Sequence, residues 1–501
     1  MDTGLRYASG PGRWVLAATV MGSAVAAIDA TVVGIALPAI GRDFGTGLAT
    51  LQWVVTAYTL TLAGLLLVAG ALGDRYGRRR VFMIGVVWFA LASVLCGIAP
   101  NAGVLIAARG LQGVGGALLT PGSLAILEAS FVPEDRGKAI GAWSGLGGVA
   151  TAIGPFLGGW LVQAASWRLI FAINIPIAAL VVALAWRHVP ESHDPDATGR
   201  VDAAGGVLVT LGLVGLTYGL IEGPARGFTD PAVATALIGG VVLLAAFVAW
   251  ERRARHPMLP LDLFASTQFT ATNLVTFVVY GALGGALFLL PIQLQQVSGY
   301  TALEAGMSLL PLTVIMLVLS ARSGALAARI GPRLQMSVGP ILVGAGFALF
   351  ILVDSNGNYL TEVLPAVIVL GLGLATTVAP LTATVLAAAP ARHAGMASAV
   401  NNDVARAAGL IAVAVLPAAA GITGAAYLHP AMFSKGFHAA ALISGALCVL
   451  GGLIAAATVR NPRRVVPVPT LGPPKQCVHC GLDAPPARAT PEEPTAVTAP
   501  S

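Results

Sequence analysis

Charged residues are scarce in this sequence. Asp, Glu, Lys and Arg make up only 10% of its 501 residues, whereas they make up about a quarter of a typical soluble domain. Apolar residues make up 56%, and the mean hydropathy is +0.84. This composition excludes a soluble globular protein. It predicts an integral membrane protein, because the apolar runs reach the length of about 20 residues that crosses a bilayer as a helix.

Cysteine is also rare, with four residues in the chain. Cys96 and Cys448 lie in apolar runs, where we expect small buried side chains and no disulfide framework. Cys477 and Cys480 belong to a proline-rich tail and form a C-x-x-C half-site around a histidine. A zinc site needs four ligands, so we expect no metal here and consider the thiols incidental.

Three further absences limit the function. No G-x-x-x-x-G-K-[ST] string occurs, so there is no Walker A loop for ATP. We expect no cofactor and no enzymatic activity, and the energy for any transport would come from an ion gradient or a partner. The net charge of +6 is spread over short loops and does not form the basic face that nucleic acid requires. Lysine is scarce, with 3 lysines against 25 arginines, which suggests a high-GC bacterial genome.

Apolar runs bounded by charges, glycine or proline predict fourteen transmembrane helices. Their approximate ranges are 14–38, 49–72, 81–99, 103–127, 139–162, 168–187, 203–222, 231–250, 269–292, 304–327, 334–353, 361–389, 396–424 and 437–458.

The loop charges predict the orientation. With both termini in the cytoplasm, the 28 Lys and Arg residues divide into 22 inside, 4 outside and 2 within helices, Arg109 and Arg406. Cytoplasmic loops carry an excess of Lys and Arg in membrane proteins. An odd number of helices would remove this asymmetry, so the charge distribution supports fourteen.

One loop string occurs twice. Residues 70–80, Gly-Ala-Leu-Gly-Asp-Arg-Tyr-Gly-Arg-Arg-Arg, follow the second predicted helix, and a shorter copy begins 254 residues later, at Gly324, after the tenth. This spacing is too long for a solenoid repeat and suits the duplicated halves of a transporter. Two six-helix halves with two helices inserted between them account for the offset.

The loop string resembles the one between the second and third helices of the major facilitator superfamily. The resemblance implies a conformational latch in which Asp74 meets the positive end of a helix in the opposite half, here the thirteenth, which begins near Gly395. In the alternative reading, Asp74 caps its own loop. The copy has Ala328 in the corresponding place, which weakens a second latch. The latch residues are Gly70, Asp74, Arg75, Gly77 and Arg78.

Three more strings are similar to the fourteen-helix drug:proton antiporter branch of that family. They are the Ile-Asp-Ala-Thr-Val-Val-Gly-Ile-Ala-Leu-Pro run of residues 28–38, the Arg-x-x-Gln-Gly motif of residues 109–113, and the Gly-Pro-x-x-Gly-Gly signature of residues 154–159. The first departs from the family pattern at Gly34, where the usual residue is Asn. The third is associated with antiporters, although close helix packing alone would also select these residues. Its members are Gly154, Pro155, Gly158 and Gly159.

Two charges lie deep within predicted helices. Asp29 is in the first and Arg109 in the fourth, and holding a charge there costs at least about 2.5–3.5 kcal/mol. A carboxyl group that alternates between an arginine and an apolar surrounding can take up and release a proton at physiological pH. We therefore predict Asp29 as the proton carrier, coupled to Arg109. Alternatively, the two form a permanent pair that only fixes the helix packing.

Other residues carry weaker predictions. Asp403 and Arg406 lie three residues apart in the thirteenth helix, and we expect them to neutralise each other as a structural pair. Some antiporters that this chain resembles carry an acidic residue deep in the tenth helix that is associated with doubly charged substrates. Residues 309–320 contain no acidic group, so the resemblance disfavours doubly charged drugs. A promiscuous cavity needs apolar and aromatic walls, although packing explains any one aromatic equally well. The candidates are Trp53, Tyr58, Phe277 and Tyr280.

The resemblance implies an all-α membrane protein with the major-facilitator fold, a six-helix bundle in residues 1–187, two inserted helices in 188–256, a second bundle in 257–459 and a disordered cytoplasmic tail in 460–501. It implies a monomer in a bacterial cell membrane that exports small amphiphilic drugs or antibiotics in exchange for protons. One alternative is a specific exporter of one metabolite, antibiotic or siderophore. Another is a membrane sensor whose tail is the output.

Overall fold

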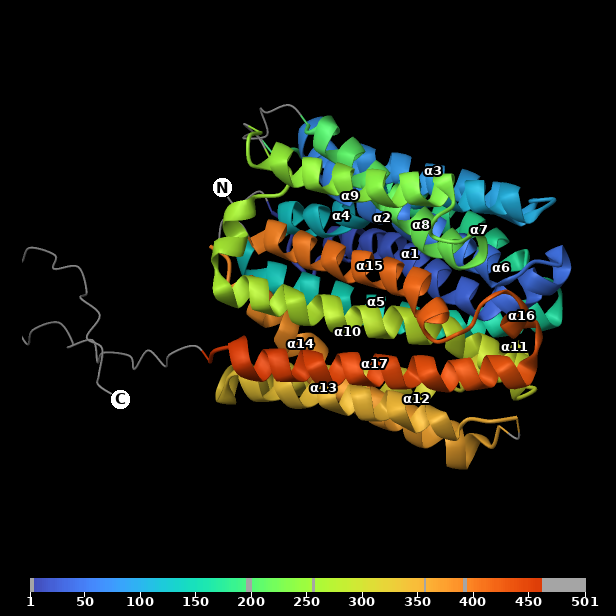
Figure 1. Cartoon of the computed structure of the whole chain (residues 1–501). Helices are drawn as coiled ribbons and strands as arrows, with labels where there is room; N and C mark the ends of the chain where they lie inside the picture. Colours follow the sequence, from blue (N-terminus) through green and yellow to red (C-terminus); the bar gives the residue numbers. More distant parts are fainter. Residues whose placement is uncertain (1–3, 195–200, 255–256, 356, 391–393, 462–501) are drawn as a thin grey trace, which may run out of the picture. The chain divides into compact units, whose positions relative to one another are not determined.

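The computed structural model describes residues 4–194, 201–254, 257–355, 357–390 and 394–461. Within them, fourteen helical segments are long and apolar enough to cross a membrane, which confirms the predicted number. The long helices run roughly parallel, and the last described residues lie at the same end as the start of α1 (Figure 1). The tail with Cys477 and Cys480 lies outside the described residues.

The first six spans form one bundle. Hydroxyl and amide side chains cap two of its helices: Ser9 Oγ accepts from Gly12 N at 3.1 Å, and Asn101 Oδ1 accepts from Val104 N at 2.9 Å. In this bundle α1 packs on α5, α7 and α4, and α4 packs on α2 and α3. The helices are α1 Gly10–Phe44, α2 Leu48–Tyr76, α3 Arg78–Gly97, α4 Ala102–Ser130, α5 Pro133–Ala164, α6 Leu169–Ala172 and α7 Asn174–His188.

The inserted pair consists of α8 Ala203–Arg226 and α9 Pro231–Glu251. These helices pack on each other with close backbone approach, since a Cβ at Gly215 would lie 3.1 Å from the Cα of Gly240. α8 also contacts α2 of the first bundle and α15 of the second. The pair therefore touches both halves.

The last six spans form the second bundle, in which α13 packs on α14 and α17, and α10 packs on α15 and α17. Short 3₁₀, π or α turns begin or end several spans. The elements are η1 Leu261–Ala265, α10 Thr267–Ile292, η2 Gln293–Val297, α11 Ala302–Met307, α12 Leu310–Ile330, α13 Pro332–Leu349, η3 Phe350–Leu352, η4 Tyr359–Val363, α14 Leu364–Ala387, α15 Ala394–Ala419, α16 Gly424–Leu428 and α17 Pro430–Thr458.

The repeated loop string has the same geometry in both halves. Gly77 between α2 and α3, and Gly331 between α12 and α13, have φ angles of +111° and +89°, a region that favours glycine. In each copy, the backbone N–H two residues after the glycine donates to a side chain. Arg79 N donates to Glu191 Oε1, and Arg333 N donates to Asn461 Oδ1, both at 3.0 Å. The duplication read from the sequence is therefore a duplication of structure.

Two ends of the helix bundle can be distinguished by connectivity. We call near end the end that holds the start of the first span, at Gly10, and the loops after even-numbered spans, including Asp74, Asp202 and Gly395. We call far end the opposite end, which holds the α1–α2 connection and the segment between Val297 and Ala302.

Candidate functional site

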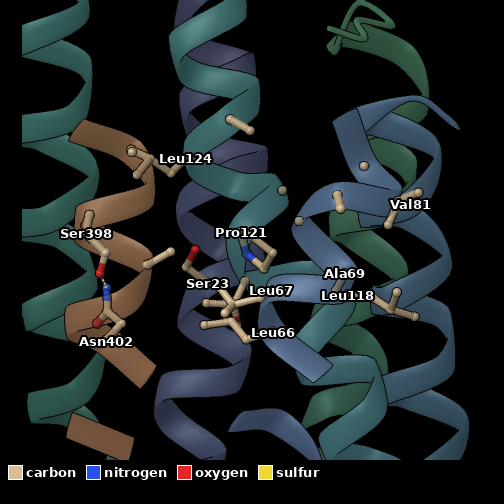
Figure 2. Close-up of a pocket in the computed structure, with 18 of the residues that line it drawn as sticks. Ser23, Leu66, Leu67, Ala69, Val81, Leu118, Pro121, Leu124, Ser398 and Asn402 are labelled. Carbon is tan, nitrogen blue, oxygen red and sulfur yellow. Dashed lines mark hydrogen bonds between the residues drawn. The ribbon is translucent and has the colours of Figure 1, made fainter. Parts of the chain in front are cut away.

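A cavity of about 880 Å³ lies between the two bundles. Helices α1, α2, α4 and α5 of the first bundle and α15 of the second supply most of its wall (Figure 2). The wall combines leucines with hydroxyl and amide side chains. Its members include Ser23, Thr31, Tyr58, Leu66, Leu67, Leu118, Thr120, Pro121, Leu124, Trp143, Ser144, Thr151, Ser398, Asn402 and Arg406.

The cavity reaches the near end. Its lining continues to residues of the near-end loops, where most of its charged side chains lie. These near-end residues are Asp74, Arg75, Arg78, Glu128, Val201, Asp202, Pro257, Met258 and Gly395.

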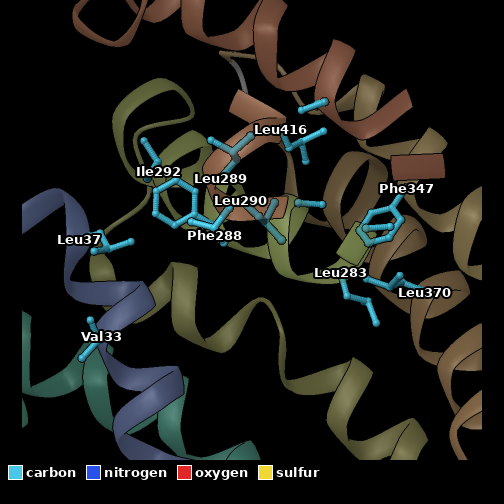
Figure 3. Close-up of a cluster of buried hydrophobic side chains, with 14 of the residues drawn as sticks. Val33, Leu37, Leu283, Phe288, Leu289, Leu290, Ile292, Phe347, Leu370 and Leu416 are labelled. Carbon is cyan, nitrogen blue, oxygen red and sulfur yellow. The ribbon is translucent and has the colours of Figure 1, made fainter. Parts of the chain in front are cut away.

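The far end is closed by contacts between the bundles. Val33 and Leu37 of α1 belong to one buried apolar cluster with Phe288, Leu289 and Ile292 of α10 (Figure 3). Each of these side chains is at most 5% exposed. The apolar seal therefore separates the cavity from the far end.

Polar groups complete the far-end seal. Gln52 Nε2 of α2 donates to the carbonyl of Val413 in α15 at 2.6 Å, and Gln295 Nε2 donates to the carbonyl of Ile35 in α1 at 2.9 Å. Both bonds join one bundle to the other. The Gln52 bond satisfies a buried donor and the Gln295 bond a partly buried one, and both hold the far end in this closed arrangement.

The glycines of the span-five signature allow close approach. A Cβ at Gly154 would collide with Thr31 Oγ1, and one at Gly158 would lie 2.9 Å from Val32 Cγ1, so both glycines face α1. Gly159 faces the second bundle, where a Cβ would lie 2.7 Å from the Cα of Leu303. The signature thus packs α5 against α1 and against α11 at once.

Asp29 lies inside the first bundle, where it is 1% exposed. Arg109 Nη1 donates to its Oδ2 at 2.5 Å, while Gln112 Nε2 and Asn174 Nδ2 donate to its Oδ1 at 2.8 and 3.1 Å. Ser93 Oγ accepts from both amides, at 2.8 and 3.2 Å. The carboxylate is therefore held by residues of two other helices, α4 and α7, and Ser93 of α3 binds the two amides that hold it.

Arg109 has further partners besides Asp29. Its Nε donates to the carbonyl of Val54 at 3.1 Å, and its Nη1 donates to Gln112 Oε1 at 2.5 Å. Its guanidinium carbon lies 4.4 Å from the centre of the Tyr58 ring. Arg109 can therefore lose Asp29 and keep several interactions.

Asp29 does not line the cavity, but its neighbourhood does. Ala30 and Thr31, which follow it in α1, are part of the wall, and so is Tyr58, which packs on Arg109. One side chain, Tyr58, thus separates the Asp29–Arg109 pair from the space between the bundles.

Four of the latch residues, Gly70, Asp74, Arg75 and Arg78, line the cavity on its near-end side. Asp74 forms a salt bridge with Arg78 at 2.8 Å, and its carbonyl accepts from the backbone N–H of Asp194 at 2.9 Å. Gly395, at the start of α15, also lines the cavity. In this conformation the Asp74 carboxylate bonds within its own loop and makes no hydrogen bond to α15 among the described residues.

The four aromatic candidates have different positions. Tyr58 lines the cavity, but Trp53, Phe277 and Tyr280 are not among the described residues that do. The reason for Trp53 is that α8 covers it: its Nε1 donates to Glu222 at 3.1 Å. Phe277 is 40% exposed and Tyr280 is half-buried, both on α10 outside the cavity wall.

The expected pair of Asp403 and Arg406 is wrong. Within the described residues no ion pair joins them, and Asp403 Oδ1 and Arg406 Nε are buried without a hydrogen-bond partner. The reason is helix rotation: Arg406 continues the row of Ser398 and Asn402 along the cavity, whereas Asp403 is turned by one residue from that row. Arg406 is therefore a cavity residue.

The sequence predicts Arg109 as a partner of Asp29, which the structure confirms, but it does not predict the other residues of this network. Gln112, Ser93 and Asn174 are each fully buried polar residues. Gln112 follows Arg109 by three residues and so shares its helix face, a spacing that could have identified it. Ser93 and Asn174 carry no such signal. Cys96 and Cys448 are buried free thiols, as predicted.

Comparison with known proteins gives a family match. The profile described as Major Facilitator Superfamily matches residues 19–414. The chain is 38% identical over 389 residues to the multidrug resistance protein Stp of Mycobacterium tuberculosis (strain CDC 1551 / Oshkosh), covering 77% of this chain and 72% of that protein. It is 37% identical to the tetracenomycin C resistance and export protein of Streptomyces glaucescens, covering 80% and 74%. It is 34% identical to the methylenomycin A resistance protein of Bacillus subtilis (strain 168), covering 89% and 94%.

Solved structures share the fold at low identity. A bacterial homolog of the human lysosomal transporter Spinster, in an inward-facing and unoccupied conformation, superposes with a TM-score of 0.63 at 16% identity, covering 90% of this chain and 97% of that one. The peptide transporter POT in complex with sulfate gives a TM-score of 0.62 at 13% identity, covering 89% and 96%.

Proposed function

Because this chain belongs to the major facilitator superfamily of membrane transporters, we propose that it exports small amphiphilic drugs or antibiotics from the cytoplasm in exchange for protons. The observation that carries the proposal is the juxtaposition of two features: a drug-sized cavity between the bundles, and a buried Asp29–Arg109 pair one side chain away from it. The names of the relatives, which include multidrug resistance and antibiotic export proteins, support this substrate class.

In the proposed cycle the near end faces the cytoplasm, as the loop charges predict, and the described conformation accepts substrate from that side. The bundles then rock, the far-end seal opens and the near end closes. Asp74 leaves Arg78 and meets the start of α15 in that second state, as the latch prediction requires. The protein acts in a bacterial cell membrane as a monomer with both termini in the cytoplasm.

Asp29 carries the proton in this proposal. When Arg109 moves toward its other partners, Gln112 and Val54, the Asp29 carboxylate loses its cationic neighbour and takes up a proton. When Arg109 returns, the proton leaves. Tyr58 packs on Arg109 and lines the cavity, so a bound substrate can influence this movement directly.

The test is the substitution Asp29→Asn in proteoliposomes that contain the purified full-length protein. We expect proton-driven transport of an exported compound to fall at least tenfold, because asparagine keeps the shape of the side chain but cannot exchange the proton. The matched control is Asp43→Asn, also in α1, whose carboxylate binds Arg168 and Trp167 at the far end. Full transport by Asp29→Asn under an imposed pH gradient would remove Asp29 from the mechanism.

A further inference from the structure

Arg406 stands out among the charges of the cavity because of its depth. It follows Gly395, at the near-end mouth, by eleven residues of α15. At 1.5 Å per residue, it lies about 16 Å into the cavity. The other charged lining residues described here, Asp74, Arg75, Arg78, Glu128 and Asp202, belong to the near-end loops or to helix turns beside them.

No described carboxylate forms an ion pair or a hydrogen bond with Arg406. Asp403 forms no ion pair with it, and Asp29 is bound to Arg109 inside the first bundle. The Nε of Arg406 is buried and has no hydrogen-bond partner. A guanidinium group remains charged at any physiological pH. The inner cavity therefore holds one permanent positive charge, the Arg406 guanidinium.

The rest of the inner wall contains no acidic group among the described residues. Ser23 and Asn402 supply hydroxyl and amide groups, and Leu66 and Leu67 supply apolar surface (Figure 2). A lipophilic cation would meet only repulsion from Arg406 here. A compound with an apolar body and one negative group would contact the apolar wall and also pair with the Arg406 guanidinium, since guanidinium groups bind carboxylates in a two-pronged geometry.

We propose that Arg406 is the residue that determines substrate charge, and that the cavity selects amphiphilic organic acids, compounds with an aromatic body and one carboxylate. This inference rests on the proposed transport function and narrows its substrate class. The substrate lies with its apolar part against α1, α2 and α4 and its carboxylate against α15.

The experiment measures binding to the full-length protein in detergent by isothermal titration calorimetry. The probes are matched sets built on naphthalene, anthracene and pyrene, each carrying a carboxylate, a neutral alcohol or an ammonium group on the same linker. We expect the carboxylate of at least one set to bind at least tenfold more tightly than its alcohol and its ammonium partner. Equal or tighter binding of the ammonium compounds, or no binding by any set, would overturn the inference without any variant.

The variant Arg406→Gln then assigns the preference to this side chain. We expect it to weaken binding of the carboxylate at least tenfold and binding of the alcohol less than twofold. The control Arg322→Gln, at an exposed arginine of α12 outside the cavity, should change neither. An unchanged carboxylate preference in Arg406→Gln would overturn the assignment.

Transport in proteoliposomes separates this inference from the function on which it rests. If the protein exports alcohols or cations under a pH gradient but not acids, the proposed preference for acids is wrong and the proposed export function is supported. If it binds acids with the expected dependence on Arg406 but moves none of the probes, the charge assignment stands and the proposed exporter fails.

Discussion

At the scale of single residues, two acidic groups buried in the membrane-spanning region have opposite surroundings. Asp29 accepts hydrogen bonds on both oxygens from Arg109, Gln112 and Asn174, whereas Asp403 has an oxygen without a partner. A buried polar group without a partner costs about 1–3 kcal/mol. The network around Asp29 therefore stabilises the first bundle in addition to any role in proton coupling.

The substitution Gln112→Leu tests that stabilising role. The variant lacks the Gln112 amide nitrogen, which donates to Asp29 and Ser93, and the amide oxygen, which accepts from Arg109. We therefore expect the free energy of unfolding to fall by about 1–3 kcal/mol. Denaturant unfolding in detergent measures the loss. The control Thr382→Val, at an exposed hydroxyl that bonds only within its own helix, should change stability by less than about 0.5 kcal/mol. Equal effects of the two variants would contradict the role of the network.

At the scale of elements, α5 and α11 form a close contact between the two bundles. A Cβ at Gly306 of α11 would lie 2.7 Å from the carbonyl carbon of Pro155, and one at Gly159 of α5 would lie equally near Leu303. Two backbones can approach so closely only where side chains are absent. The antiporter-associated signature is therefore part of the far-end seal in this structure.

The substitution Gly306→Ala adds a single methyl group to this contact. We expect it to weaken the far-end seal, favour the opposite conformation and lower the transport rate at least tenfold, while the protein still reaches the membrane. Gly239→Ala, in α9, is the matched control because a Cβ there meets no atom within 4 Å. A normal transport rate in Gly306→Ala would show that the contact is not part of the cycle.

At the scale of the whole described chain, the two bundles enclose a cavity that is continuous with one end only. The near-end loops line it, while apolar packing of α1 on α10 closes the far end (Figures 2 and 3). Alternating access requires this asymmetry, since a cavity open at both ends would dissipate the gradient.

Site-directed labelling tests the asymmetry and the orientation together. In a background with Cys477→Ser and Cys480→Ser, we expect Ser398→Cys to react with a membrane-impermeant maleimide from the cytoplasmic face of inverted vesicles and not from intact cells. Ser398 lines the cavity. The control Leu37→Cys, at a fully buried far-end position, should react from neither side. Labelling of Ser398→Cys from intact cells alone would reverse the predicted orientation.

The main features of the fold could be read from the sequence. The number of spans, the duplicated loop string and the identity of the buried acid follow from hydropathy, charge and spacing, which act locally along the chain. Even the span-five signature indicated close packing correctly. Some boundaries differ: the first span extends over Gly10–Phe44 instead of 14–38, because its polar ends remain helical beyond the apolar run.

What the sequence by itself determined is therefore which segments cross the membrane and which residues must be exceptional within it. The tertiary structure decided how those segments are rotated against one another. The rotation of the helices brings the amides of Gln112 and Asn174 within hydrogen-bond distance of Asp29. It also directs Trp53 toward α8, and it directs Arg406, but not Asp403, toward the cavity. The sequence defines which residues share a face of a helix, because the helical period is fixed. Which face packs against which neighbour depends on contacts between helices that are distant in sequence.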